Sequence, residues 1–240
     1  MTTLEAVNIR RSRRNYVSTP IEKDVVEKLR ASMEQYNNTA NLSMQLILNN
    51  PEAFNGLSKS YGLFSGVSKY MALVGQRSDE NLKEKFGYYG EKLVIEATQL
   101  GLGTCWVGGT FDKKSCVCEV QKGEAFYCVI AIGNTVSELS FKEKLIAKVI
   151  HRKTKSVDEL YEADGEVPEW FLKGMQAVQR APSAVNKQPV TFYFKNGIVS
   201  AAVKDISAYQ PIDMGIAKLH FEIGANGGVW DWGNKAIFKK

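Results

Sequence analysis

The chain has 240 residues, 44% of them hydrophobic and 24% charged, with a formal net charge of +5 at pH 7. This composition is typical of a globular protein that buries one sizeable core or two closely packed ones. No apolar run is long enough to span a bilayer, and residues 1–5 lack the basic-then-apolar order of a secretory signal, so we expect a cytoplasmic protein. Its four cysteines lack C-x-x-C spacing, which favours free thiols without a bound metal.

The first notable segment is basic and lies at residues 9–16. In an extended chain, residues two apart face the same way, so Arg10, Ser12 and Arg14 are positioned to converge on one anion. Guanidinium groups beside a hydroxyl suit a phosphate monoester. The alternative interpretation is a solvated basic arm.

Hydrophobic periodicity and turn residues then predict the elements in chain order. Thr19, Pro20 and Glu22 form a capping-box pattern at the start of a helix whose apolar face includes Leu29 and Met33. The further predictions are strands at 42–48 and 70–74, an exposed connection at 55–68, a helix at 89–100, a buried strand at 126–132, a helix at 168–179, strands at 191–194 and 198–203 around an Asn-Gly hairpin turn, and a helix capped by Asp213.

Two loops carry the most specific patterns. Residues 101–109 are rich in glycine, which allows the backbone to approach a flat ligand with its amides free; a simple helix end and turn is the alternative. At residues 181–189, called here the Pro-Ser loop, Pro182 ends a helix and small side chains at Ser183 and Ala184 leave the backbone accessible. Asn186 and Gln188 add amide donors, although an ordinary helix-to-strand connection is also possible.

A shift of 126 positions aligns two helix ends, with five identities in fifteen positions from Lys92 on Lys218 to Trp106 on Trp232. This similarity predicts an old duplication, unless two amphipathic helices resemble each other by chance. The first repeat would span 1–160 and a shortened second repeat 161–240, packed together as one globular unit. Such a chain would form an internal pseudo-dimer about an approximate two-fold axis.

The basic segment, the glycine-rich segment and the Pro-Ser loop together resemble the FMN-dependent nitroreductase family, with a weaker likeness at residues 151–153. The resemblance implies an α+β fold with a mixed, mainly antiparallel sheet flanked by helices. In that family the Pro-Ser loop follows the first helix, a place that residues 37–41 occupy here. Because the family's two subunits share two FMN sites, a fused chain with one copy of each element would keep one FMN.

The resemblance also implies roles for individual residues. Residues of the basic segments would hold the FMN phosphate, namely Arg10, Ser12 and Arg14 with Arg152 or Lys153. Residues of the Pro-Ser loop would line the ribityl chain and ring edge, namely Pro182, Ser183, Ala184 and Asn186. Backbone amides of Val107, Gly108 and Gly109 would lie against the isoalloxazine near N5 and O4. Val190 stands where the family often has Trp, which makes that wall thinner.

The implied activity is hydride transfer from NAD(P)H through FMN to a small electron-poor acceptor such as a nitroaromatic or a quinone. The flavin would carry the chemistry, so no catalytic side chain is expected, and His220 is interpreted as a helix-packing residue. We expect no nucleic-acid or membrane partner, and a monomer suffices to complete the site. A flavin-binding carrier or redox sensor without turnover is the alternative, and a nucleic-acid-binding module is disfavoured by the modest charge.

Overall fold

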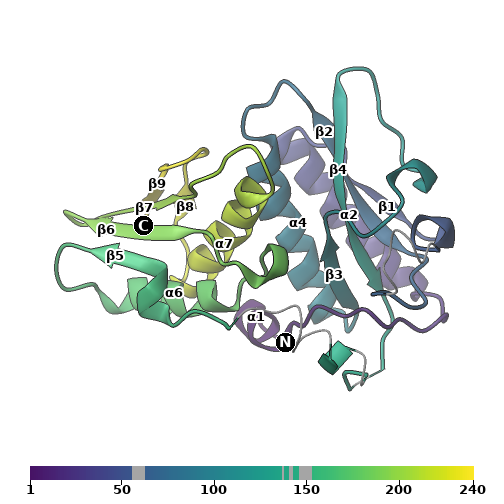
Figure 1. Cartoon of the computed structure of the whole chain (residues 1–240), viewed down its shortest axis with the longest axis horizontal. Coiled ribbons are helices and arrows are strands. Elements are labelled where there is room, and N and C mark those ends of the chain that lie inside the picture. The colour runs from purple at the N-terminus through teal and green to yellow at the C-terminus, as the bar shows by residue number, and fades with distance from the viewer. Residues whose placement is uncertain (56–62, 137, 141–142, 146–152) are drawn as a thin grey trace. The chain divides into compact units, whose positions relative to one another are not determined.

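The computed structural model describes residues 1–55, 63–136, 138–140, 143–145 and 153–240 (Figure 1). The chain divides into two compact units with a sheet in each. The β1–β4 unit comprises Arg10–Glu80 and Leu93–Ile150, and the β5–β9 unit comprises Met1–Ile9, Asn81–Lys92 and His151–Lys240. Helix α4 (Leu82–Gln99) therefore contributes residues to both units. These compact units do not test the repeats predicted at 1–160 and 161–240, because the repeats were defined by sequence similarity. The repeats stay a prediction.

Four antiparallel strands form the sheet of the β1–β4 unit, in the order β1-β2-β4-β3. The strands are β1 (Gln45–Ile47), β2 (Tyr70–Gln76), β3 (Gly103–Val107) and β4 (Glu124–Gly133). Strands β2 and β4 are almost continuously apolar, and most of their residues are buried. Both strands confirm the predictions at 70–74 and 126–132. The unit also holds α2 (Lys23–Ala40) and the 3-10 turns η1 (Pro51–Ala53) and η2 (Lys113–Ser115).

Helix α2 begins later than the capping-box pattern predicts. Its N-cap is Glu22, with no side-chain cap, and the Thr19 hydroxyl instead accepts a hydrogen bond of 3.0 Å from Asn134 Nδ2. The predicted start was wrong because Asn134, just after β4, ties Thr19 to the sheet. The predicted apolar face is confirmed, since Leu29 and Met33 are buried.

The glycine-rich segment also differs from its prediction. Residues 103–107 form strand β3, which pairs with β4 from Gly103 opposite Gly133 to Val107 opposite Val129. The prediction of a loop was wrong for these residues. Thr104, Cys105, Trp106 and Val107 all suit a pleated, half-buried surface. The predicted strand at 42–48 is likewise confined to β1. The exposed connection at 55–68 lies partly outside the described residues.

Five strands form the sheet of the β5–β9 unit, in the order β5-β6-β7-β9-β8, with only the β5–β6 pair parallel. They are β5 (Tyr161–Ala163), β6 (Thr191–Lys195), β7 (Ile198–Ala202), β8 (Val229–Trp230) and β9 (Ile237–Lys239). Asn196 and Gly197 have φ values of 51° and 74°, which confirms the predicted hairpin turn. Mixed, mainly antiparallel sheets with flanking helices confirm the predicted α+β class.

The helices of this unit cover an aromatic core. They are α1 (Thr3–Ile9), α6 (Glu169–Arg180), α7 (Gln210–Gly224) and the 3-10 turns η3 (Val157–Leu160) and η4 (Ala184–Asn186), together with the first part of α4. Phe192 of β6 stacks on Phe221 of α7 with ring centroids 5.1 Å apart. Asp213 was wrong as the cap of α7, since that helix begins at Gln210 and Asp213 lies buried in its first turn.

The first part of α4 and the first part of α7 cross at two glycines. A Cβ on Gly215 would lie 1.9 Å from the Glu84 carbonyl oxygen, and one on Gly87 would lie 2.0 Å from the Ile212 carbonyl oxygen. Glycine therefore allows the two backbones to touch. Under the 126-residue shift, Ile212 corresponds to Phe86, so corresponding stretches of the two helices meet, as they do in an isologous dimer contact.

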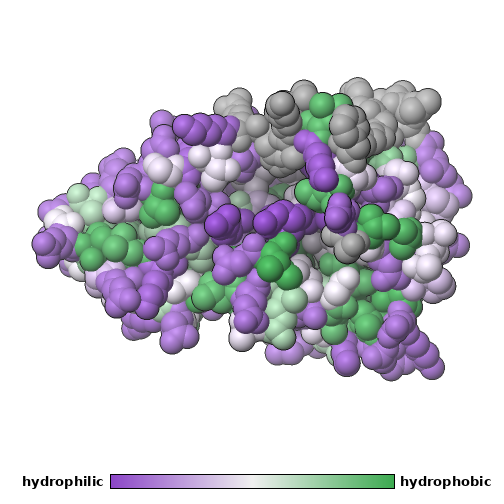
Figure 2. Space-filling view, turned by 90° about the horizontal axis from the view of Figure 1, so that it is seen from below, coloured by the Kyte–Doolittle hydropathy of each residue, from purple (hydrophilic) through white to green (hydrophobic). Residues whose placement is uncertain are grey.

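On the face shown in Figure 2, hydrophilic side chains are interspersed with separate hydrophobic ones. Within the part of the chain that the structure describes, no helix is long and apolar enough to cross a membrane.

Candidate functional site

The basic segment is extended, as its alternating pattern predicts. Ser12 forms an isolated parallel bridge with Thr104 of β3, and the Arg13 N–H donates to the Thr104 carbonyl over 2.8 Å. Arg13 is buried, whereas Arg10, Ser12 and Arg14 are partly exposed. The segment therefore turns Arg13 into the protein and keeps its alternate residues accessible.

Arg10, Ser12 and Arg14, called here the arginine clasp, lie at alternate positions of the extended segment that Ser12 pairs with β3. Burial raises the pKa of Cys105, while the charges of Arg14 and Arg10 and a hydrogen bond with Ser12 oppose that rise. All three residues therefore influence the surroundings of one thiol. Their joint binding of one anion stays a prediction.

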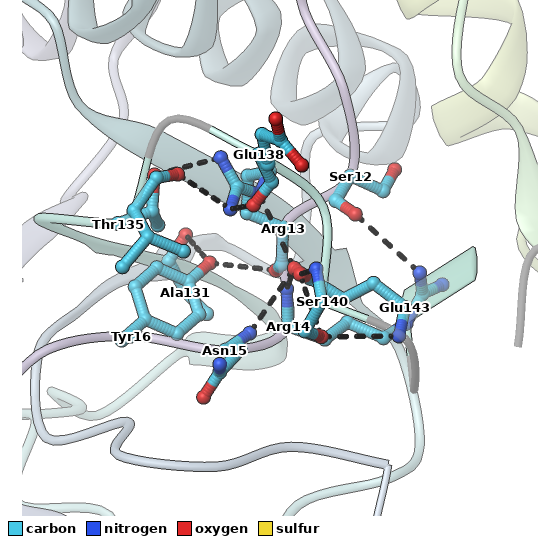
Figure 3. Close-up of polar contacts among 11 residues, drawn as sticks. Ser12, Arg13, Arg14, Asn15, Tyr16, Ala131, Thr135, Glu138, Ser140 and Glu143 are labelled. Carbon is cyan, nitrogen blue, oxygen red and sulfur yellow. Dashed lines mark hydrogen bonds and ion pairs between the residues drawn. The ribbon is translucent and has the colours of Figure 1, made fainter. Parts of the chain in front are cut away.

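The buried carboxylate of Glu143 supports the backbone of the clasp at Arg14 (Figure 3). Glu143 Oε1 accepts hydrogen bonds from the N–H groups of Arg14 and Asn15, at 2.7 and 3.2 Å, and from Arg13 Nε at 3.2 Å. Its other oxygen accepts from Ser140 N and Oγ at 2.8 and 2.9 Å. The remaining Arg13 donors reach the Thr135 hydroxyl and the carbonyls of residues 136 and 138. These contacts fix the backbone of the clasp before any ligand arrives.

Neither Arg13 nor Glu143 is identifiable as part of this arrangement from the sequence. Alternation along residues 10–14 separates Arg13 from the clasp, but it gives no reason to bury a guanidinium. Glu143 is 130 positions away from Arg13, in a segment without a strong pattern. The contact depends on the folded sheet, which brings the segment after β4 against the segment before α2.

Glu143→Gln should destabilise the protein in a pH-dependent way. Burial alone would raise the pKa of Glu143, but the N–H groups of Arg14 and Ser140, with the Arg13 guanidinium, lower it to about 2. The ionised carboxylate therefore contributes stability above pH ~4.5 that is lost as pH falls towards 2. At pH 7 we expect the free energy of unfolding, from urea titration, to fall by on the order of 3 kcal/mol.

The exposed Glu138 provides the matched control, since only its carbonyl contacts Arg13. Glu138→Gln should unfold as the wild type does. The difference between wild type and Glu143→Gln should shrink as pH is lowered from 4.5 to 2. An equal difference at pH 7 and pH 2.5 would contradict the role assigned to this carboxylate.

The predicted ring-facing residues follow β3 directly. Val107 is the last residue of that strand and lies buried in the core, Gly108 is partly exposed, and Gly109 is exposed. A Cβ at Gly109 would meet no atom within 4 Å, so the backbone there is open. Ser12 of the clasp pairs with Thr104 of β3, and Val107 follows three residues later on that strand. The distance along β3 from the clasp to Val107 is therefore about 10 Å.

The Pro-Ser loop leaves α6 at Pro182, as predicted, and then adopts unusual backbone angles. Val185, Asn186 and Gln188 have φ values of 47°, 51° and 44°, a region that non-glycine residues seldom occupy. The Ser183 hydroxyl accepts a hydrogen bond of 2.9 Å from the Gln188 N–H. The loop is therefore held in a strained conformation by its own side chains.

Gln188 anchors the loop to the segment before η3. Its side-chain oxygen accepts from the Lys155 N–H at 2.8 Å, and its carbonyl accepts from Lys155 Nζ at 2.9 Å. Asn186 Nδ2 donates to the Thr154 hydroxyl over 3.4 Å. Gln188 is thus a structural residue, and Thr154 and Lys155 lie beside the Pro-Ser loop.

Several predicted site residues are not brought together by these contacts. Lys153 is exposed in the β5–β9 unit, and Arg152 lies outside the described residues. The Pro-Ser loop belongs to the β5–β9 unit, and the arginine clasp to the β1–β4 unit. The meeting of loop, clasp and second basic segment at one site stays a prediction. Val190 is buried in the core of its own unit, so it forms no exposed wall.

Asp213 is a further residue at the Pro-Ser loop. Its Oδ1 accepts a hydrogen bond of 3.0 Å from the Ala184 N–H. Only 6% of Asp213 is exposed, and it lines a small hollow with Pro182, Ser183 and Gln188. Burial raises the pKa of this carboxyl to about 7, opposed by the Ala184 N–H and by the charge of Lys187. The sequence signal at Asp213 was interpreted as a helix cap.

His220 has the packing role expected of it. Its ring is fully buried, with Nδ1 3.1 Å from the Ala177 carbonyl and Nε2 3.0 Å from Glu91 Oε1. A second buried pair joins Lys218 of α7 to Glu84 of α4. Both pairs link helices within the β5–β9 unit, and both are buried, so they are interpreted as structural rather than as parts of a ligand site.

The architecture defines an α+β protein, and the arginine clasp beside the edge strand β3 of its antiparallel sheet is the candidate anion site. The family model described as "Putative TM nitroreductase" matches residues 2–225, and the chain belongs to this family. A search of curated proteins gave no match.

The chain is similar to several solved structures, and the first of those described next gives the same fold. The chain is similar to a structure from Thermotoga maritima described as a putative nitroreductase, with 18% identity, a TM-score of 0.64, and coverage of 99% of this chain and 92% of that one. An FMN-dependent nitroreductase from Clostridium difficile matches with 17% identity and a TM-score of 0.45, over 62% of this chain and 98% of its own. A Desulfovibrio desulfuricans nitroreductase in complex with FMN matches with 18% identity and a TM-score of 0.44, over 61% and 96%.

Proposed function

We propose that the protein is an FMN-dependent oxidoreductase that passes hydride from NAD(P)H to a small electron-poor acceptor such as a nitroaromatic or a quinone. The observation that carries this proposal is that Arg10, Ser12 and Arg14 lie, partly exposed, at alternate positions of one extended segment beside β3 in a member of a nitroreductase family. Two fixed positive charges and a hydroxyl suit the phosphate of FMN. NADH or NADPH, the acceptor and the cytoplasm as location are further parts of the proposal.

The residues present fit this cofactor. The arginine clasp is supported by Glu143, so little ordering is needed when a phosphate binds. About 10 Å further along β3, the open backbone at Gly109 lies at a distance that a ribityl chain can bridge. When bound, FMN supplies the hydride-accepting and hydride-donating chemistry. The chain would bind the phosphate, offer backbone amides to the ring and restrict water with the Pro-Ser loop.

One FMN per chain and a monomeric protein follow from a proposed duplication. Elements occur in the same order in both halves: α2, β1, β2, α4, β3, β4 and then α6, β6, β7, α7, β8, β9. The sheet orders β1-β2-β4-β3 and β6-β7-β9-β8 correspond, and so does the crossing of α4 with α7. These correspondences support a fused pseudo-dimer that completes its own site. Such a protein needs no second chain, nucleic acid or membrane.

A visible spectrum of the purified protein tests the proposal. After incubation with FMN and removal of excess, we expect bound flavin absorbance that NADH or NADPH bleaches without oxygen. Nitrofurazone or menadione should then restore the oxidised spectrum. Protein that cannot take up FMN would contradict the proposal. Bound FMN with no NAD(P)H oxidation would favour the alternative, a flavin carrier or redox sensor.

A further inference from the structure

The Pro-Ser loop is held closed by polar contacts at Ala184, Asn186 and Gln188. Ala184 donates its N–H to Asp213, Asn186 Nδ2 donates to the Thr154 hydroxyl, and Gln188 contacts Lys155 and Gln179. Further contacts lie within the loop, including the Asn186 N–H to the Ser183 carbonyl at 3.0 Å. Three non-glycine residues at positive φ, one of them the β-branched Val185, oppose this conformation. The balance between closed and open loop is therefore sensitive to a single added cost.

Asp213 is placed to supply that cost. Its carboxyl faces an apolar hollow whose other walls include Leu160, Val178 and Val190, and those walls carry no charge. A carboxylate has about four acceptor positions, and Ala184 offers one donor. Among the described residues, the charge that acts on it is that of Lys187, which belongs to the loop itself. An ionised carboxylate is thus poorly satisfied while the loop is closed, and it gains water when the loop opens.

We propose that Asp213 is a protonation-dependent latch on the Pro-Ser loop, which stays closed while the carboxyl is protonated and opens when the carboxyl ionises. Protonated Asp213 still accepts the Ala184 N–H through its carbonyl oxygen and leaves no charge in the hollow. The raised pKa of Asp213, about 7, has the same direction, because the closed state retains a proton that a solvated carboxyl would release. Only the assignment of the loop to flavin rests on the proposed function.

Hydrogen exchange of the amides of residues 184–188 tests the latch without flavin. After correction for the intrinsic exchange rate, their protection in the wild type should be constant below about pH 4, where the carboxyl is protonated in both states. Between about pH 4 and pH 7 it should fall about tenfold per pH unit, because opening releases the proton that the closed state retains, and above pH 7 it should level off. Amides of α6 should keep their protection over the same range. Loop protection that does not fall between pH 5 and pH 7 would overturn the proposal.

Asp213→Asn provides the decisive variant. Asparagine keeps the size and an acceptor oxygen for the Ala184 N–H but carries no charge at any pH. Its loop should show the low-pH protection of the wild type up to pH 9. Glu222→Gln is the matched control, since Glu222 is a partly buried carboxyl of α7 that also has a raised pKa but pairs with Tyr88. A pH trend that survives in Asp213→Asn, or disappears in Glu222→Gln, would refute the latch.

Added FMN separates the latch from the proposed function. If the closed loop binds flavin, FMN at about 100 times its Kd should raise loop protection about 100-fold at each pH. Unchanged protection with a pH trend that depends on Asp213 would support the latch and reject the flavin assignment. Raised protection without any pH trend would reject the latch and support the flavin assignment.

Discussion

Replacing both Arg10 and Arg14 with alanine should weaken FMN binding by roughly two to four orders of magnitude. Each arginine is assigned one charge-assisted contact with the phosphate, and such contacts contribute about 1.5–3 kcal/mol each. Since about 1.4 kcal/mol corresponds to a factor of ten in affinity, losing both should leave purified protein colourless. Flavin fluorescence titration at fixed ionic strength measures the effect directly.

Two comparisons make this result specific to the clasp. Arg11→Ala removes a positive charge from the same segment, but its exposed side chain is not part of the clasp, so FMN affinity should change little. Riboflavin, which has no phosphate, should bind wild type and double variant equally. A double variant with wild-type affinity for FMN would remove the phosphate assignment, and with it the main support for the proposed function.

The second large effect concerns stability. Gly215→Ala should lower the free energy of unfolding by at least about 3 kcal/mol, since overpacking a close contact is among the costliest substitutions. The added methyl group would lie 1.9 Å from the Glu84 carbonyl oxygen, and neither helix backbone can yield locally. This cost must exceed the gain of about 1 kcal/mol that alanine brings to a helix interior. Urea unfolding followed by circular dichroism measures the change.

Gly165→Ala is the matched control in the same unit. It introduces the same methyl group where no atom lies within 4 Å, and so unfolding should change by less than about 0.5 kcal/mol. If Gly215→Ala unfolds at the same urea concentration as the wild type, the close crossing of α4 and α7 is wrong.

Local patterns predicted local structure well in this chain. The Asn196-Gly197 turn, the buried strand β4 and the helix before Pro182 each follow from residues within a few positions of one another. The alternation of Arg10, Ser12 and Arg14 likewise predicted an extended segment, because side-chain direction in a strand depends only on its own backbone. The family resemblance then supplied the α+β class, which the fold confirms.

Predictions failed where a distant residue competes for a local one. Asn134 takes the Thr19 hydroxyl that would otherwise cap α2, and pairing with β4 converts most of the glycine-rich segment into strand. Glu143 could not be connected to the clasp, since no pattern in sequence signals a contact across 130 positions. Asp213 was misread because a carboxylate near a helix start usually caps it, whereas here it receives the Ala184 N–H.

The buried pair of Glu84 and Lys218 has a consequence for how such a chain evolves. Under the 126-residue correspondence, Lys218 matches Lys92 and Glu84 matches Gln210, which bears no charge. In a homodimer both sides of the contact have the same sequence, so each substitution changes both sides and each ion pair occurs twice. A chain fused as the proposed duplication has it escapes this constraint: Lys218 is buried against an acid, while the matching Lys92 lies over the Tyr88 ring. Under that proposal each half is free to acquire a role that the other does not share.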